Sequence, residues 1–233
     1  LHWINNDGPV QPGQLVLVDA GVEVDSLYTA DVTRTIPVDG RFTAPQRRVY
    51  EAVLEAADAA FARLAGACRA RGLALMLDGV LGHVGTEHPL FRAARAGGGE
   101  RGLFRFDDAA GGESGGRAGP GYATFEGHES LAALNHGSPE VRDLAVRILT
   151  HWLDRGASAW RLDAAYGIDP AFWASVLPAV RERHPDAWFM GEVIHGDYAG
   201  FVEASTVDTV TQYELWKATW SSLADVNFYE LDW

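Results

Sequence analysis

Arg161 and Asp163 end an apolar run that begins at Ala159, and they are two residues apart. Because side chains alternate between the two faces of a strand, this spacing predicts that the guanidinium and the carboxylate point to the same side. Charged groups at the end of a buried strand are costly to keep without partners. The pattern by itself leaves two interpretations, a structural ion pair and a carboxylate held for chemistry.

Two further carboxylates fall on a predicted hairpin near the start of the chain. Asp19 ends the apolar run 15–18, and Asp31 lies in a second strand predicted over 28–36. Strands joined by a turn can place the two aspartates side by side, where like charges repel unless a divalent cation lies between them. The hairpin is therefore either a metal site or an acidic hairpin without a metal.

The elements that must position Arg161 and Asp163 alternate between strands and helices. Continuous apolar runs predict strands at 73–77, 159–163, 187–190 and 207–210. Capping residues and apolar residues at helical spacing predict helices from Ser138 to Gly156, from Asp169 past Val180, at 198–204 and at 215–223. This rhythm is typical of an α/β fold with a parallel sheet, in which polar residues after each strand carry the chemistry.

A long glycine-rich excursion, residues 84–137, interrupts this rhythm. Loops of this length are usually lids or disordered segments, so we expect a lid. Four aromatic residues could pack inside it, namely Phe104, Phe106, Tyr122 and Phe125.

The first segment of the chain carries a dense set of motifs: His2-Trp3, Asn6-Asp7-Gly8-Pro9, Pro12-Gly13, Asp19-Ala20-Gly21, Asp31-Val32-Thr33-Arg34-Thr35, Pro37-Val38 and Gly40-Arg41-Phe42. In these motifs, residues 1–61 resemble the Xaa-Pro aminopeptidases, which are metallopeptidases of the pita-bread fold. The resemblance implies that Asp19 and Asp31 are two ligands of a two-metal site for Mn²⁺ or another divalent cation, and that His2 faces the substrate. A later histidine and two later glutamates of that family have no counterpart downstream, so we expect an incomplete metal site.

A second set of motifs lies further along: Asp78-Gly79-Val80 with His83, Gly156 through Arg161-Leu162-Asp163-Ala164, Gly191-Glu192-Val193, and Gln212-Tyr213-Glu214-Leu215-Trp216-Lys217. In these motifs, residues 62–233 resemble the α-amylase family of glycoside hydrolases, which implies part of a TIM-type (β/α) barrel. The resemblance implies that Asp163 is the nucleophile and Glu192 the general acid/base. It also implies substrate contacts from four residues, Asp78, His83, Arg161 and His195.

The implied reaction is a retaining double displacement on an α-glucosidic bond, which needs no cofactor. Such a reaction requires two carboxylates about 5 Å apart, one ionised and one with a raised pKa. Neighbouring parallel strands, about 4.8 Å apart, would place Asp163 and Glu192 at this separation. The first two barrel strands and the family's third carboxylate have no counterpart, so we expect impaired hydrolysis. Unpaired edges of half a barrel predict self-association.

One predicted helix, 43–71, runs through the place where the two resemblances meet, near residue 61. We interpret this place as a join, natural or made, between an aminopeptidase-like segment, 1–61, and an amylase-like segment, 62–233. The alternative is one ordinary long helix. Three hypotheses on function follow: an α-amylase-type hydrolase, a fragment of a metal-dependent Xaa-Pro aminopeptidase, and a catalytically inactive chimera.

Composition narrows the choice of partners. The net charge of −13 argues against nucleic acid, because binding phosphates requires a basic surface. No apolar run is long enough to span a membrane, and no basic-then-apolar leader is visible, so we expect a cytoplasmic protein. The start at Leu1 suggests a missing upstream segment. The expected partner is an α-glucan or a small α-glucoside.

Overall fold

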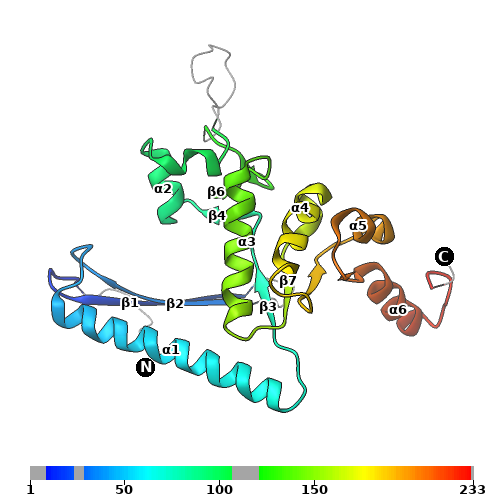
Figure 1. The fold of residues 1–233 in the computed structure, drawn as a ribbon, viewed down its shortest axis with the longest axis horizontal. Coiled ribbons are helices and arrows are strands. Elements are labelled where there is room, and N and C mark those ends of the chain that lie inside the picture. Colours follow the sequence, from blue (N-terminus) through cyan, green and yellow to red (C-terminus); the bar gives the residue numbers. More distant parts are fainter. Residues whose placement is uncertain (1–8, 24–28, 107–120, 232–233) are drawn as a thin grey trace, which may run out of the picture. The chain divides into compact units, whose positions relative to one another are not determined.

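The computed structural model describes residues 9–23, 29–106 and 121–231 of the chain (Figure 1). Two units are distinguished by their internal contacts, Leu1–Arg63 and Leu64–Trp233. The boundary between them falls inside helix α1 (Ala44–Ala70), which is one unbroken helix. The predicted helix over 43–71 is therefore confirmed, and the separate origin of the two segments stays a prediction.

The first unit contains an antiparallel hairpin, β1 (Leu15–Glu23) and β2 (Thr29–Pro37), followed by the first part of α1. In the hairpin, Asp19 pairs with Thr33, and Asp31 pairs with Gly21. The two aspartates therefore occupy diagonal positions of the ladder rather than directly opposite ones. Their side chains, and all of His2, lie outside what the structure describes.

Helix α1 begins with a reciprocal cap. The backbone N–H of Thr43 donates to Oε1 of Gln46 at 2.8 Å, and the backbone N–H of Gln46 donates to Oγ1 of Thr43 at 3.4 Å. This arrangement satisfies two backbone donors that a helix start otherwise leaves without partners.

A four-stranded parallel sheet forms the centre of the second unit. Its strands are β3 (Met76–Gly79), β7 (Ala159–Leu162), β8 (Trp188–Gly191) and β9 (Thr209–Val210), in that spatial order. This confirms a mixed α/β fold with a parallel sheet. Within the described ranges the sheet is open, and no closed barrel is formed.

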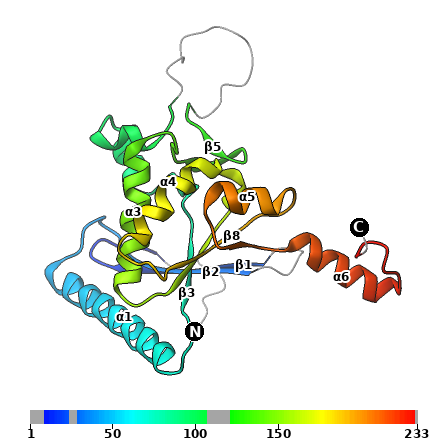
Figure 2. The ribbon, with the colours of Figure 1, turned by 45° about the vertical axis from the view of Figure 1, so that its right-hand side comes forward.

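Four helices connect and follow these strands: α3 (Pro139–Asp154), α4 (Pro170–Arg181), α5 (Tyr198–Ser205) and α6 (Tyr213–Asp225) (Figure 2). Ser138 and Asp169 cap α3 and α4 through their side-chain oxygens, as their sequence positions predict. Many apolar side chains of the strands and of α4 are fully buried, for example Leu162, Phe189 and Trp173. Because strands and helices alternate, every strand of this sheet runs in the same direction, and the carboxyl ends of the strands lie at one edge of the sheet.

The described parts of the excursion, 84–106 and 121–137, contain regular secondary structure. They contain a second small sheet in the order β4-β6-β5, with β4 (His83–Gly85), β5 (Thr124–Phe125) and β6 (His128–Ala133), together with helices α2 (Pro89–Arg95) and η1 (Gly99–Leu103). Aromatic rings hold them together: Phe91 lies 5.0 Å from Phe104 and 4.8 Å from Tyr122 between ring centroids. These strands are too short and irregular for hydrophobic periodicity to predict them.

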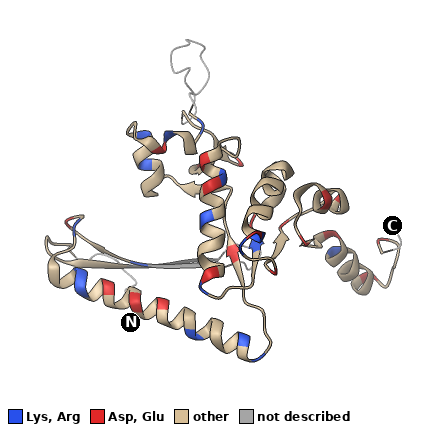
Figure 3. Cartoon of the chain, in the orientation of Figure 1, with Lys and Arg blue, Asp and Glu red and all other residues tan. Residues whose placement is uncertain are grey.

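Charged side chains of both signs are mixed along α1 and α3 (Figure 3). Such mixing is typical of helix faces that contact water. Among the described residues, no helix is long and apolar enough to cross a membrane.

Candidate active site

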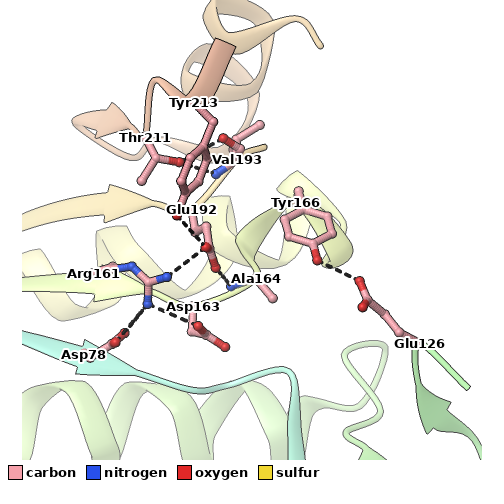
Figure 4. A network of polar contacts seen from close by, with 10 residues as sticks. All are labelled: Asp78, Glu126, Arg161, Asp163, Ala164, Tyr166, Glu192, Val193, Thr211 and Tyr213. Atoms are coloured by element: carbon pink, nitrogen blue, oxygen red, sulfur yellow. Dashed lines mark hydrogen bonds and ion pairs between the residues drawn. The ribbon is translucent and has the colours of Figure 1, made fainter. Parts of the chain in front are cut away.

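The polar residues at the edge of the four-stranded sheet come from three neighbouring strands (Figure 4). Asp78 of β3 and Arg161 of β7 are register partners, Asp163 follows β7, and Glu192 follows β8. Because the strands are parallel, their carboxyl ends meet at this edge. The sheet therefore brings together four residues that the sequence places in three separate segments.

Arg161 contacts all three carboxylates. Its Nη1 lies 2.7 Å and 2.8 Å from the two oxygens of Asp78 and 3.1 Å from Oδ1 of Asp163, and its Nη2 lies 2.9 Å from Oε1 of Glu192. The contact between Arg161 and Asp163 that the two-residue spacing predicts is confirmed. Burial alone would lower the pKa of Arg161, but the hydrogen bond and charge of Asp78, followed by the charge of Glu192, raise it.

Glu192 accepts hydrogen bonds from two further donors. The backbone N–H of Ala164 lies 2.8 Å from Oε2, and the hydroxyl of Tyr213 lies 3.0 Å from Oε1. Burial of Glu192 raises its pKa, but the donors Ala164, Tyr213 and Arg161 together outweigh burial, so the pKa is lowered. The expectation of a raised pKa at Glu192 is therefore wrong for this arrangement, because each donor stabilises the anion.

The loop after β7 is fixed to both adjoining strands. The backbone N–H of Asp163 donates to the carbonyl of Gly79 at 3.0 Å, and that of Tyr166 donates to the carbonyl of Glu192 at 3.0 Å. Ala164 has a left-handed backbone, with φ of 46°, which turns its N–H toward the Glu192 carboxylate. Non-glycine residues adopt this conformation rarely.

His83 lies where the small sheet meets the site. Its ring stacks on Phe125 with centroids 4.3 Å apart. Burial lowers the pKa of His83, and the negative charge of Asp163 acts in the opposite direction. Within the described part of the chain, Nδ1 of His83 is buried and has no hydrogen-bond partner.

Among the predicted site residues whose side chains the structure describes, one does not join this cluster. His195 lies in the exposed loop between β8 and α5, and none of the hydrogen bonds or ion pairs among the described residues connects it to the carboxylates. Asp19 and Asp31 belong to the first unit. Conversely, three residues that the structure places at the site were not among the predicted site residues, namely Tyr166, Tyr213 and Glu126. For Tyr166, the sequence offered one indication of a place at the site, since this residue lies only three residues after Asp163.

The N-terminal segment of the chain is similar to metallopeptidases. The family model of metallopeptidase family M24 matches residues 1–86. Xaa-Pro aminopeptidase 2 of Streptomyces coelicolor is 64% identical over 62 residues, which are 27% of this chain and 13% of that protein. Xaa-Pro aminopeptidase of Haemophilus influenzae is 54% identical over 56 residues, or 13% of its length. The shared segment is thus short in these relatives.

A different group of proteins matches the larger part of the chain. Neopullulanase 2 of Thermoactinomyces vulgaris is 29% identical over 154 residues, which are 66% of this chain and 26% of that protein. The structure of the cyclic alpha-maltosyl-(1→6)-maltose hydrolase of Arthrobacter globiformis aligns with a TM-score of 0.63 and 27% identity, over 72% of this chain and 38% of that one. A Nostoc punctiforme debranching enzyme soaked with acarbose aligns with a TM-score of 0.59 and 28% identity, over 69% of this chain and 35% of that one.

Both resemblances are confirmed. The N-terminal segment is similar to Xaa-Pro aminopeptidases, and most of the chain is similar to α-amylase-family enzymes. The chain spans only 13% of the aminopeptidases and 26% to 38% of the amylase-type proteins named above.

The two-metal site that the aminopeptidase resemblance implies involves Asp19 and Asp31, whose side chains lie outside the residues that the structure describes. Catalytic metal sites usually take at least three protein ligands. In the ranges that the structure describes, no three His, Cys, Asp or Glu residues are grouped to hold an ion. Asp19 and Asp31, at diagonal positions of the hairpin, supply two carboxylates. Metal binding there stays a prediction.

Proposed function

We propose that the second unit carries a glycoside hydrolase site of the α-amylase type, which acts on α-glucosidic bonds. One observation carries this proposal: Arg161 contacts the carboxylates of both Asp163 and Glu192 at the ends of two neighbouring parallel strands. The similarity to neopullulanase 2 and to the maltosyl-maltose hydrolase supports it.

In the proposed reaction, a carboxylate oxygen of Asp163 attacks the anomeric carbon. The bond from that carbon to the leaving oxygen breaks, and the leaving oxygen takes a proton from Glu192. Glu192 then removes a proton from water, which attacks the same carbon and releases Asp163. Arg161, whose Nη1 lies 3.1 Å from Oδ1 of Asp163, would orient this carboxylate for the attack.

The first step requires a proton on Glu192, whereas the three donors around Glu192 favour its anion. Substrate entry would therefore have to displace at least one of them. The ion pair with Arg161 is the one that a substrate can replace, because Arg161 keeps Asp78 and Asp163 as partners.

The site is also open to water, with 61% of the Asp78 side chain and 28% of the Asp163 side chain exposed. Water weakens charge interactions and leaves less of the transition-state stabilisation that a closed site provides. We therefore propose slow hydrolysis compared with an enclosed site of the same residues.

Hydrolysis of an aryl α-glucoside tests the proposal directly. We expect the chain to release the phenol and the variant Asp163→Asn to lose this activity. Asp225→Asn, which makes the same chemical change at an exposed position of α6, should retain it. Equal rates for the chain and for Asp163→Asn would contradict the proposal.

A second candidate, a metal-dependent peptidase fragment, is favoured only by the aminopeptidase match of the first unit. Calorimetric titration with Mn²⁺ separates it from the first candidate. Tight binding that Asp31→Ala abolishes would support it, and absence of heat would exclude it. If the glucoside assay and the titration both fail while the chain unfolds cooperatively, an inactive chimera is the remaining hypothesis.

A further inference from the structure

The turn between β5 and β6 carries a glutamate at a position that rarely takes one. Phe125 and His128 are register partners, so Glu126 and Gly127 form the two-residue turn, with φ of 48° and 81°. Both values are positive, a conformation that favours Asn-Gly, Asp-Gly or Gly-Gly. A glutamate there is unfavourable for the backbone, and such a conformation persists only where surrounding contacts compensate for it.

The Glu126 side chain contacts a residue next to the candidate catalytic pair. The hydroxyl of Tyr166 donates to Oε1 of Glu126 at 2.7 Å, across 40 positions of sequence. Tyr166 itself is fixed through its backbone N–H to the carbonyl of Glu192. Figure 4 shows this pair beside Asp163 and Glu192. The hydrogen bond therefore connects the excursion to the loop that carries Asp163.

Two other observations agree with a defined position for Tyr166. Phe125, the neighbour of Glu126, stacks on His83, so the same turn contacts the site at a second point. The hydrogen bond to Glu126, followed by burial and by the charge of Glu126, raises the pKa of Tyr166 to about 12. The phenol is thus held as a neutral donor, although 38% of the residue remains exposed to ligands.

We propose that Glu126 is a positioning residue that holds Tyr166 beside the Asp163–Glu192 pair, and that Glu126 and Tyr166 together bind the hydroxyls of a glucosyl unit adjoining the cleaved bond. The chemistry of the pair suits such a ligand. A carboxylate accepts hydrogen bonds from sugar hydroxyls, and a tyrosine offers an apolar ring with a polar tip. This inference rests on the proposed function, because the glucosyl unit that it concerns is defined by its position next to the bond that the site is proposed to cleave.

Calorimetric titration of the full chain with acarbose, used as an α-glucan analogue, tests the inference. We expect Glu126→Ala and Tyr166→Phe each to weaken binding about tenfold, the effect of losing one charge-assisted hydrogen bond. Because the two residues contact each other as well as the ligand, the loss in the double variant should be smaller than the sum of the two single losses. Glu126→Gln, which keeps a neutral acceptor, should fall between the chain and Glu126→Ala. Glu129→Ala on the same hairpin should bind like the unmodified chain, since it is the backbone carbonyl of Glu129 that accepts from Tyr122.

A second measurement, the titration of Tyr166, reports on the hydrogen bond between Glu126 and Tyr166. In chains labelled with ¹³C at the tyrosine Cζ, the signal missing from Tyr166→Phe identifies Tyr166. Its titration should move from about 12 toward 10.0 in Glu126→Gln, a variant that preserves the shape of the turn. A destabilised fold would change several tyrosine signals rather than this one.

The outcomes are distinct. If the unmodified chain does not bind acarbose, the proposed function fails and the inference falls with it. If the chain binds acarbose but Glu126→Ala and Glu126→Gln bind equally well, the inference alone is overturned. Additive losses in the double variant, or an unchanged Tyr166 titration in Glu126→Gln, would also overturn it.

Discussion

Arg161 forms ion pairs with three carboxylates at once, those of Asp78, Asp163 and Glu192. Its side chain is 24% exposed and that of Glu192 is 15% exposed, so water solvates this pair only partly. Removing the arginine would leave Asp78, Asp163 and Glu192 close together without their cation. A partly buried charge without its partner costs more than an exposed one.

We therefore predict that Arg161→Gln lowers the free energy of unfolding by roughly 2 kcal/mol, which is less than for a fully buried pair because water reaches Asp78. Urea denaturation of the chain and the variant measures the difference. Arg142→Gln, which removes an exposed pair with Asp143, is the matched control and should change stability by less than about 0.5 kcal/mol. Equal effects of the two substitutions would refute a central role for Arg161.

Glu192 gives a prediction with a defined sign in pH. Its pKa in the folded chain lies below the ordinary value of 4.5, so the stability it contributes is present above about pH 4.5 and is lost as the pH falls further. Glu192→Gln should therefore be less stable than the unmodified chain at pH 7, and the difference should shrink below pH 4.5. Thermal unfolding at several pH values measures it. A difference that stays constant down to pH 3 would show that the carboxylate is not stabilised as an anion.

For single residues, the sequence allowed us to predict only contacts between residues that are close together in the chain. The spacing of Arg161 and Asp163 predicted their contact because a strand alternates its faces. The donors to Glu192 were not predictable, because Tyr213 comes from a helix that only the folded sheet brings near. The left-handed backbone of Ala164 also has no signal in its residue type.

Among the elements, the parallel strands position the site, because they place the ends of β3, β7 and β8 at one edge. Their apolar runs and the flanking caps predicted these strands and their helices, but β3 begins three residues later than the predicted run at 73–77, and β9 contains only the last two residues of 207–210. The small sheet of the excursion was not predicted, since its strands are short and the contacts that stabilise it are between aromatic rings distant in sequence. The contact from Glu126 to Tyr166 therefore also required the structure.

The turn at Gly156, between α3 and β7, offers a test of backbone strain and crowding at one position. Gly156 has φ of 108°, and a Cβ there would lie 3.0 Å from Ala65 and from Arg69. Gly156→Ala should lower the free energy of unfolding by about 1–2 kcal/mol through backbone strain and crowding. Gly66→Ala, in open space on α1, should raise it by about 0.5–1 kcal/mol because alanine favours helix. Chemical denaturation measures both, and effects of the same sign would contradict this account of the turn.

At the scale of the whole molecule, the described residues include open sheet edges and exposed apolar side chains, which proteins in water usually cover. The four-stranded sheet is open, and α6 exposes large apolar side chains, with Trp216 at 68% and Trp220 at 64%. Open edges and exposed apolar faces favour association. Sequence motifs predicted the two resemblances, but neither motif nor composition could show which helix face is left uncovered.

We predict concentration-dependent self-association that is reduced when Trp216 and Trp220 are both changed to Glu. Sedimentation velocity over a range of protein concentrations measures it. Thr219→Glu adds a charge to an exposed position of the same helix without removing an apolar group, and it should reduce association less. A chain that remains monomeric at all concentrations would exclude this surface as an interface.

The most direct test of the central claim is covalent trapping of Asp163. A 5-fluoro-α-glucosyl fluoride reacts with a retaining nucleophile by forming a bond from the carboxylate to the anomeric carbon and releasing fluoride, and the fluorinated intermediate is then slow to hydrolyse. After digestion, mass spectrometry should find the glucosyl adduct on the peptide containing Asp163, and Asp163→Asn should give no adduct. An unlabelled chain, or a label on another carboxylate that persists in Asp163→Asn, would contradict the assignment.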